Sequence, residues 1–204
     1  MSMLDKAIEK RSMWNVDKIR EAWILASHYH TGQKYGGERE GEQIEYLEHI
    51  GAVMIEVQNA IQYDKTIQNK ELAILCAILH DILEDSDCTP EEIRQRFGRE
   101  VLQGVQALTK NDLIESKQDK MLDSLKRIKA LRTPEVGMVK LADRVCNLAA
   151  PPFYWTREKM ISYIDEARVI HEELSICSVY LAERLRQKIE AYETNFIGLK
   201  DIKE

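Results

Sequence analysis

The sequence lacks any long apolar run, and this absence limits what the protein can be. Its longest uninterrupted apolar stretch is Leu72–Leu79, far shorter than the ~20 residues that a membrane-spanning helix needs. Residues Met1–Trp14 mix charged and apolar side chains and lack the apolar segment of a secretory signal peptide. The sequence therefore predicts a cytoplasmic protein that makes no use of a membrane.

Basic charge and paired cysteines are also scarce. The net charge of −6 argues against a nucleic-acid-binding protein, which usually carries a basic face. The four cysteines show no C-x-x-C spacing, so we expect reduced thiols rather than disulfides. With 44% apolar and 31% charged residues among 204, the composition predicts one globular domain over residues 1–204. Its core is expected over about 15–175, with a C-terminal helix to about 193.

Helical periodicity dominates the chain, and no alternating strand pattern is present. Asn15 and Thr89 are predicted N-caps, and Gly98 is a predicted helix C-terminal glycine. The stretch 32–41 holds four of the nine glycines and is expected to be a loop. The predicted fold class is all-α, a single-domain helical bundle, with helices over 15–30, 46–63, 69–84, 90–97, 99–108, 116–131, 135–148 and 157–192.

His80 and Asp81 stand at the end of the longest apolar run. An imidazole beside a carboxylate offers two metal ligands, and burying bare charges costs several kcal/mol each. Glu84 and Asp85 follow at four-residue spacing, so they are expected to stack on His80 and Asp81 along one helix. A divalent cation would neutralise such a group, and a hydrogen-bonded pair at a helix end is the simpler alternative.

Two further segments favour the metal interpretation. His49 opens an amphipathic stretch, and Asp143 and Asn147 are polar residues four apart in an otherwise apolar helical pattern. Two histidines and two aspartates form a mixed nitrogen and oxygen set that suits Mn, Fe, Zn or Mg-like ions. For Asp143, the alternative is a salt bridge with Lys140 or Arg144, both within one helical turn.

In this order the three segments resemble the HD-domain superfamily, and more closely the hydrolase domain of the RelA/SpoT alarmone enzymes and small alarmone hydrolases. The resemblance runs from about Ala22 to Leu174 and is most specific over 80–85 and 140–147. It implies a water-positioning pair, Glu84 and Asp85, and a substrate contact at Asn147. It also implies a divalent cation, with Mn²⁺ as first choice, held by His49, His80, Asp81 and Asp143.

The implied activity is metal-dependent hydrolysis of the 3′-pyrophosphate of a guanosine alarmone such as ppGpp. Lys34, Lys140 and Arg144 are candidate phosphate ligands, and Tyr35 and Tyr46 are candidates for stacking on the base. Basic residues over 117–132 either rim the site or form a solvated helix face. Two alternatives stay open, a phosphohydrolase of a nucleoside monophosphate or phosphorylated dinucleotide, and a non-catalytic nucleotide sensor. The intact Glu84-Asp85 pair argues against the sensor, and a homo-oligomer is also open.

Three departures from the family concern the substrate rather than the metal. His49 is followed by Ile50 where the family has proline, and Ala149-Ala150 replace polar or basic residues. The segment Gln33–Gln43 is long and acidic where the family has a short basic turn. We therefore expect the metal chemistry to be retained, with alarmone hydrolysis showing a raised Michaelis constant or being a side activity.

Overall fold

Three mutually packed helices form the centre of the molecule. The computed structural model describes residues 15–65 and 67–198, so the predicted absence of a signal peptide in Met1–Trp14 lies outside the described residues. Helix α4 (Lys70–Leu79) packs against both α3 (Tyr46–Tyr63) and α8 (Pro134–Asn147), which also pack against each other. Every residue from Leu72 to Leu79 is buried, as expected for a helix that is apolar on all sides.

Helix α2 (Val16–His30) covers one side of this centre and packs against α3 and α4. It begins as predicted, because the side chain of Asn15 accepts a hydrogen bond from the main-chain N–H of Lys18. The predicted limits of α3 are also confirmed. Helix α2 thus contacts two of the three central helices.

Helices α5 (Pro90–Phe97), α6 (Arg99–Leu108) and α7 (Lys117–Leu131) follow along the chain. Thr89 caps α5 by accepting from the N–H of Glu92, and the next helix starts directly after Gly98 at φ +90°. A glycine is favoured at this junction because other residues rarely adopt a positive φ. These predictions from the Thr-Pro and Gly signals are confirmed.

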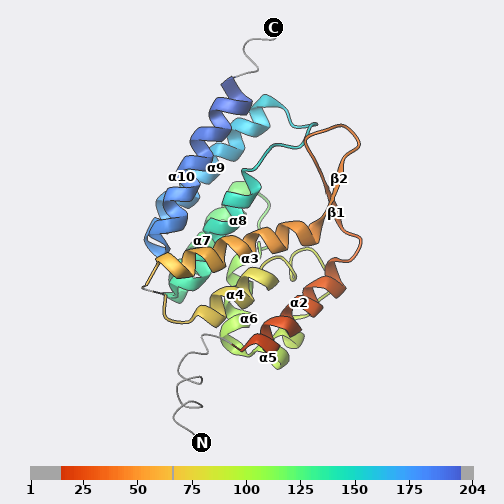
Figure 1. Cartoon of the computed structure of the whole chain (residues 1–204), viewed down its shortest axis with the longest axis vertical. Helices are drawn as coiled ribbons and strands as arrows, with labels where there is room; N and C mark the ends of the chain where they lie inside the picture. Colours follow the sequence, from red (N-terminus) through yellow and green to blue (C-terminus); the bar gives the residue numbers. More distant parts are fainter. Residues whose placement is uncertain (1–14, 66, 199–204) are drawn as a thin grey trace, which may run out of the picture.

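The predicted helix over 157–192 is interrupted. Helix α9 (Arg157–Leu174) ends in a short 3₁₀ turn, Ser175–Cys177, and α10 (Val179–Tyr192) starts afresh. Ser178 has extended backbone and caps α10 by accepting from the N–H of Leu181, so the chain reverses there. The two helices lie side by side over α8 (Figure 1), and a π-helical turn, Glu193–Ile197, follows α10.

The predicted loop over 32–41 contains part of a β-hairpin, which corrects the expectation that the chain has no strands. Strand β1 (Lys34–Gly36) pairs antiparallel with β2 (Gln43–Glu45), with Tyr35 opposite Ile44. The strands are too short to show an alternating pattern, so their pairing depends on the turn between them. The hairpin projects from the helices in Figure 1, and the N–H of Phe153 donates to the carbonyl of Gly37 at 3.1 Å.

The fold class is nevertheless the predicted one, a helical bundle with this single small sheet among the described residues. None of the helices in residues 15–65 and 67–198 is both long and apolar enough to cross a bilayer.

Candidate metal centre and catalytic cavity

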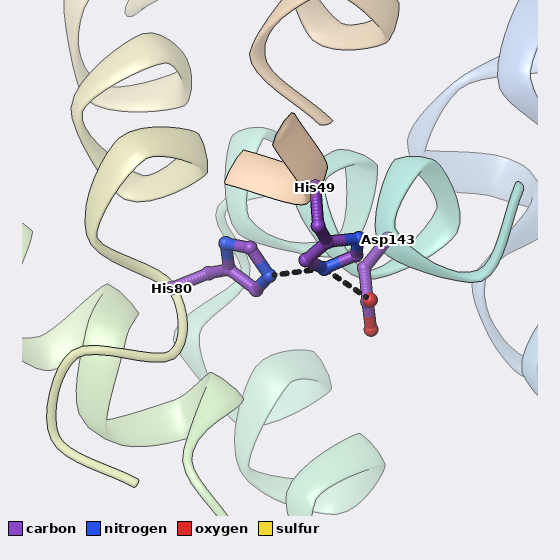
Figure 2. A group of neighbouring side chains, drawn as sticks. All are labelled: His49, His80 and Asp143. Carbon is purple, nitrogen blue, oxygen red and sulfur yellow. Dashed lines mark hydrogen bonds and ion pairs between the residues drawn. The ribbon is translucent and has the colours of Figure 1, made fainter. Parts of the chain in front are cut away.

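His49, His80 and Asp143 converge although they are far apart in the sequence. His49 lies in the first turn of α3, His80 is the residue that ends α4, and Asp143 lies in α8. One ligand atom of each lies within 4.8 Å of those of the other two, and all three residues are buried. Figure 2 shows the two imidazole rings and the carboxylate directed at one point.

The contacts of the His80 ring indicate that a positively charged species lies between the Nε2 atoms of His49 and His80. Nδ1 of His80 lies 2.9 Å from the carbonyl oxygen of Ala77, so this nitrogen donates and Nε2 is left for a ligand role. Nε2 of His80 faces Nε2 of His49 at 3.3 Å. Two nitrogen lone pairs repel at this distance, so a proton or a cation must lie between them.

Asp81 completes the group. Its Oδ2 lies 3.0 Å from Nε2 of His80 and 3.8 Å from Nε2 of His49. Burial would lower the pKa of His80, but the Asp81 carboxylate raises that pKa to about 9. Burial would likewise raise the pKa of Asp81, yet His80 holds it well below its ordinary value. The group thus favours one positive charge close to its carboxylates, the role that a divalent cation fills.

Asp143 has partners of its own. Its Oδ1 lies 3.5 Å from Nε2 of His49 and accepts from Nδ2 of Asn147 at 2.5 Å. Its Oδ2 accepts from Nζ of Lys140 at 2.9 Å. Although burial opposes ionisation, Lys140 and His49 hold the pKa of Asp143 well below its usual range. The salt bridge that was the alternative to metal binding is therefore present together with the histidine contact.

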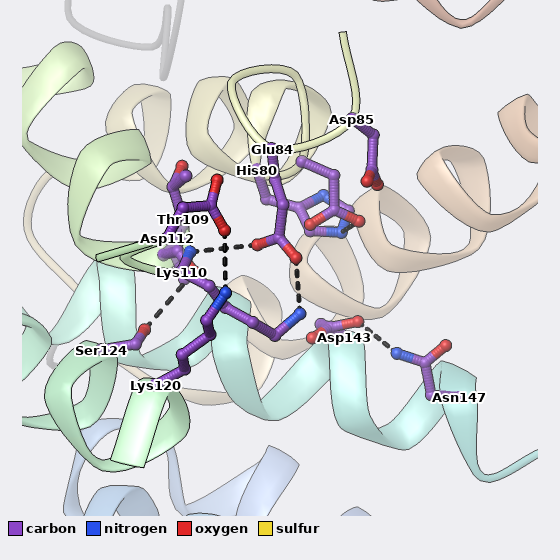
Figure 3. A network of polar contacts seen from close by, with 12 residues as sticks. His80, Glu84, Asp85, Thr109, Lys110, Asp112, Lys120, Ser124, Asp143 and Asn147 are labelled. Atoms are coloured by element: carbon purple, nitrogen blue, oxygen red, sulfur yellow. Dashed lines mark hydrogen bonds and ion pairs between the residues drawn. The ribbon is translucent and has the colours of Figure 1, made fainter. Parts of the chain in front are cut away.

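The Glu84-Asp85 pair does not lie on a helix. Helix α4 ends at Leu79, and the N–H groups of Glu84 and Asp85 both bond to the carbonyl of Asp81, so the predicted stacking on His80 along one helix is wrong. The turn separates the two carboxylates. Glu84 accepts from the N–H of Lys110 at 3.0 Å and from its Nζ at 2.5 Å (Figure 3).

Asp85 instead belongs to the other side of the group. The hydroxyl of Tyr46 lies 3.0 Å from Oδ2 of Asp85 and 2.5 Å from Oδ2 of Asp81. Burial and the neighbouring Asp81 raise the pKa of Asp85. Tyr46 thus bridges these two carboxylates. Its hydroxyl contacts the cluster of His49, His80, Asp81 and Asp143, which we call the metal group.

A cavity of about 1060 Å³ opens over these residues. One wall carries Lys110, Lys117 and Lys120, and the other is formed by the hairpin and the loop after α8, with Tyr35 and Tyr154. The wall beside Glu84 is therefore basic, and for Lys117 and Lys120 this favours the first of the two sequence-based alternatives, that basic residues over 117–132 rim the site. The floor is lined by Asp81 and Asp143, the two aspartates that contact His49, and by the catalytic candidates Glu84 and Asp85.

The structure places some of the predicted substrate contacts in the cavity and others away from it. Tyr46, Lys140 and Asn147 lie at the metal group and line the cavity. Arg144 also lines it, but its guanidinium stacks on Tyr163 at 4.0 Å and contacts Glu166 at 3.2 Å. Lys34 pairs with Glu45 across the hairpin at 2.8 Å and is not among the residues that line the cavity.

Sequence reasoning missed a role for Lys110. The resemblance to the alarmone hydrolases also extends over Leu108-Thr109-Lys110, but nothing in the sequence shows that Lys110 reaches Glu84. Of the basic residues over 117–132, Lys117 and Lys120 line the cavity. Arg127 contacts main-chain carbonyls of the α6 end, and Lys129 pairs with Glu173.

Comparison with known proteins places this geometry in a family. The chain is 33% identical over 135 residues to guanosine-3′,5′-bis(diphosphate) 3′-pyrophosphohydrolase of Aquifex aeolicus, covering 66% of this chain but only 18% of that protein. It is 28% identical over 184 residues to the protein of that activity named MESH1 in Mus musculus, covering 85% of this chain and 93% of the mouse protein.

A solved structure shares the fold. It was described for a metazoan ortholog of SpoT that hydrolyzes ppGpp, and it superimposes with a TM-score of 0.69 at 23% identity, covering 85% of this chain and 94% of that one. The profile of the HD domain matches residues 22–153, which include all four predicted metal ligands. The chain therefore belongs to the HD-domain family.

Proposed function

We propose that this protein is a metal-dependent hydrolase that removes pyrophosphate from the 3′ position of ppGpp, with Mn²⁺ as the metal. The observation that carries the proposal is the convergence of His49, His80, Asp81 and Asp143 at a cavity that Glu84 also lines. The pyrophosphohydrolase relative from mouse, matched over most of both chains, supports the choice of substrate.

The four side chains fit a divalent cation. They offer two imidazole nitrogens and two carboxylates, a donor set that Mn²⁺ and similar ions accept. Hydrogen bonds fix two of them, through Ala77 to His80 and through Asn147 to Asp143, as is usual for partners of metal ligands. A cation held there polarises a phosphoryl oxygen and makes a water molecule more acidic.

Glu84 is the proposed general base. Its carboxylate lines the cavity next to the metal group and takes the proton of the attacking water. The water oxygen forms a bond to the phosphorus that carries the 3′ oxygen, and the bond from this phosphorus to the 3′ oxygen breaks. The 3′ oxygen takes up the proton that Glu84 removed from the water and leaves as a hydroxyl. The products are pyrophosphate and guanosine 5′-diphosphate. Asp85 and Tyr46 hold Asp81 in place from the opposite side.

The basic wall supplies the countercharge for the leaving pyrophosphate. Lys117 and Lys120 line the cavity from α7, and charge-assisted bonds to phosphate are each worth about 1.5–3 kcal/mol. This wall supplies part of the positive charge that the acidic hairpin lacks. The raised Michaelis constant, the cytoplasmic location and a homo-oligomeric state stay predictions.

A nucleotide panel tests the proposal. Purified protein is incubated with Mn²⁺ and ppGpp, nucleoside monophosphates or phosphorylated dinucleotides, and both phosphate and pyrophosphate are measured. We expect pyrophosphate and guanosine 5′-diphosphate in equal amounts from ppGpp. Release of phosphate from another nucleotide alone would favour the other HD phosphohydrolase activity, and tight nucleotide binding without turnover would favour a sensor.

A further inference from the structure

The carbonyl groups at the end of α6 are satisfied by side chains of α7. The carbonyl of Ala107 accepts from Oγ of Ser124 at 2.7 Å, and Ser124 is buried. The carbonyl of Gln106 accepts from Nη1 of Arg127. A helix end leaves such carbonyls without intrahelical partners, and here the neighbouring helix provides them.

Arg127 also holds the residue that follows the helix. Its Nη2 donates to the carbonyl of Thr109 at 2.7 Å, and its Nε donates to Asp123 at 2.7 Å. Ser124 and Arg127 are three residues apart and therefore lie on one face of α7. Together they fix the main chain of α6 up to the peptide group that carries the N–H of Lys110.

That peptide group is directed at Glu84. The N–H of Lys110 donates to Oε2 and the ammonium to Oε1, so one residue holds both oxygens of the carboxylate (Figure 3). Glu84 lies in the turn after α4, where no helical ladder sets the direction of its side chain. The direction of Glu84 is therefore set from α6 and α7 rather than from its own segment.

We propose that Lys110 and Arg127 are positioning residues for Glu84, Lys110 by direct contact and Arg127 by fixing the main chain before Lys110. This proposal rests on the proposed function, since Glu84 must be the general base for its direction to matter. A misplacement of about 1 Å in a reacting group can cost ~100-fold in rate. The arrangement thus predicts that Arg127, which holds the main chain before Lys110 rather than Glu84 itself, affects catalysis.

A role in phosphate binding is the competing explanation for Lys110, because its ammonium lies in the basic wall. The two roles make different predictions. A phosphate ligand contributes to substrate affinity whether or not Glu84 can act as a base. A positioning residue loses its effect once the base is gone.

The decisive experiment is a double-mutant cycle with ppGpp and Mn²⁺. We expect Lys110→Met to lower kcat by about 10- to 100-fold with KM within about twofold. Glu84→Gln carrying Lys110→Met should be no slower than Glu84→Gln alone. The control is Lys129→Met, which breaks a similar exposed ion pair on α7 with Glu173 and should leave kcat unchanged.

Arg127 extends the test beyond direct contact. Arg127→Met should lower kcat with KM retained, and Arg127→Lys should recover part of the loss by bonding to one of the two carbonyls. If Arg127→Met unfolds the protein, Arg127→Lys alone still decides, because it should lower kcat in the parent but not in Glu84→Gln.

A readout independent of turnover comes from thermal unfolding. The losses in melting temperature of Lys110→Met and Glu84→Gln should be less than additive in the double variant, as for residues in contact. Additive losses, or a KM effect of Lys110→Met that persists in Glu84→Gln, would overturn the proposal. Failure of the proposed function would instead show in the unchanged protein, as absence of pyrophosphate release.

Discussion

The metal group and the cavity rim differ in how their residues are held. His49, His80 and Asp143 come from helices that pack on one another in the core, and all three are buried. The rim is made by a small hairpin and by the loop after α8, which meet through the bond between Phe153 and Gly37. The proposed metal ligands therefore belong to the core, while one side of the cavity is formed by surface segments.

This difference indicates which residues can be substituted without loss of the proposed hydrolysis. A ligand in the core cannot move without disturbing three packed helices. The side chain of a rim residue can turn away from the cavity at little cost, as Lys34 shows by pairing with Glu45. Two of the three departures from the family, Gln33–Gln43 and Ala149-Ala150, lie in the rim, whereas Ile50 is buried in α3. A new substrate preference would be expected to arise in the rim.

The largest effect is expected from the core side of this comparison. Asp143→Asn keeps the shape of the side chain but removes a charge from the metal group, so metal content should fall and hydrolysis should drop by at least ~1000-fold, since a catalytic cation contributes several kcal/mol. Metal analysis and turnover with Mn²⁺ check this. Asp165→Asn, an exposed change in an ion pair with Arg168, should alter neither quantity. Full metal content with full activity in Asp143→Asn would contradict the assignment of this ligand.

Glu84→Gln separates metal binding from proton transfer. The variant should keep its metal and its fold yet hydrolyse ppGpp ~100-fold more slowly, the usual scale for loss of a general base. Steady-state kinetics and metal analysis on one preparation provide the test. Turnover equal to that of the parent would mean that the water is activated without Glu84.

A pair of lysine variants compares the basic wall of the cavity with the hairpin of the rim. Lys120→Met removes a cation that lines the cavity, where it pairs with the exposed Asp112 at 2.9 Å. Because a phosphate can replace this exposed partner, KM for ppGpp should rise by about 10-fold or more through loss of a charge-assisted phosphate bond. Lys34→Met removes an exposed pair within the hairpin, and KM should stay within about twofold. The reverse order of effects would show that the hairpin, not α7, binds the phosphates.

Arg144 should matter more for stability than for substrate binding. The residue is 6% exposed, and its guanidinium is engaged by Tyr163 and Glu166. Arg144→Met should reduce the free energy of unfolding by about 2 kcal/mol, or roughly 4–8 °C in melting temperature, with KM changed little. A large rise in KM at unchanged melting temperature would restore the sequence-based prediction that Arg144 contacts substrate.

The convergence of His49, His80 and Asp143 could be anticipated because helical periodicity reveals which residues face the core, while their assignment as metal ligands rests on the resemblance to the HD-domain superfamily. His49 and Asp143 each stand in an amphipathic helix whose limits were read correctly, or within one residue. His80 and Asp81 end a helix that is apolar all round. A polar side chain at such a position needs a partner, and that requirement is visible without a structure.

The rim and the Glu84-Asp85 pair were less predictable because their positions depend on turns and on contacts between residues far apart in the sequence. The end of α4 at Leu79 separates Glu84 from His80, and no local signal marks this end. The contact of Lys110 with Glu84 joins residues 26 positions apart. The hairpin was missed because three-residue strands give no period, and the break at Ser178 was missed because it contains neither proline nor glycine.

The central claim is that the metal group and Glu84 together hydrolyse the 3′-pyrophosphate of ppGpp. The most direct test is one preparation of the unchanged protein, loaded with Mn²⁺, analysed for bound metal and then assayed with ppGpp. The account predicts about one cation per chain, and pyrophosphate and guanosine 5′-diphosphate released in equal amounts. A fully metal-loaded protein that leaves ppGpp intact would contradict it.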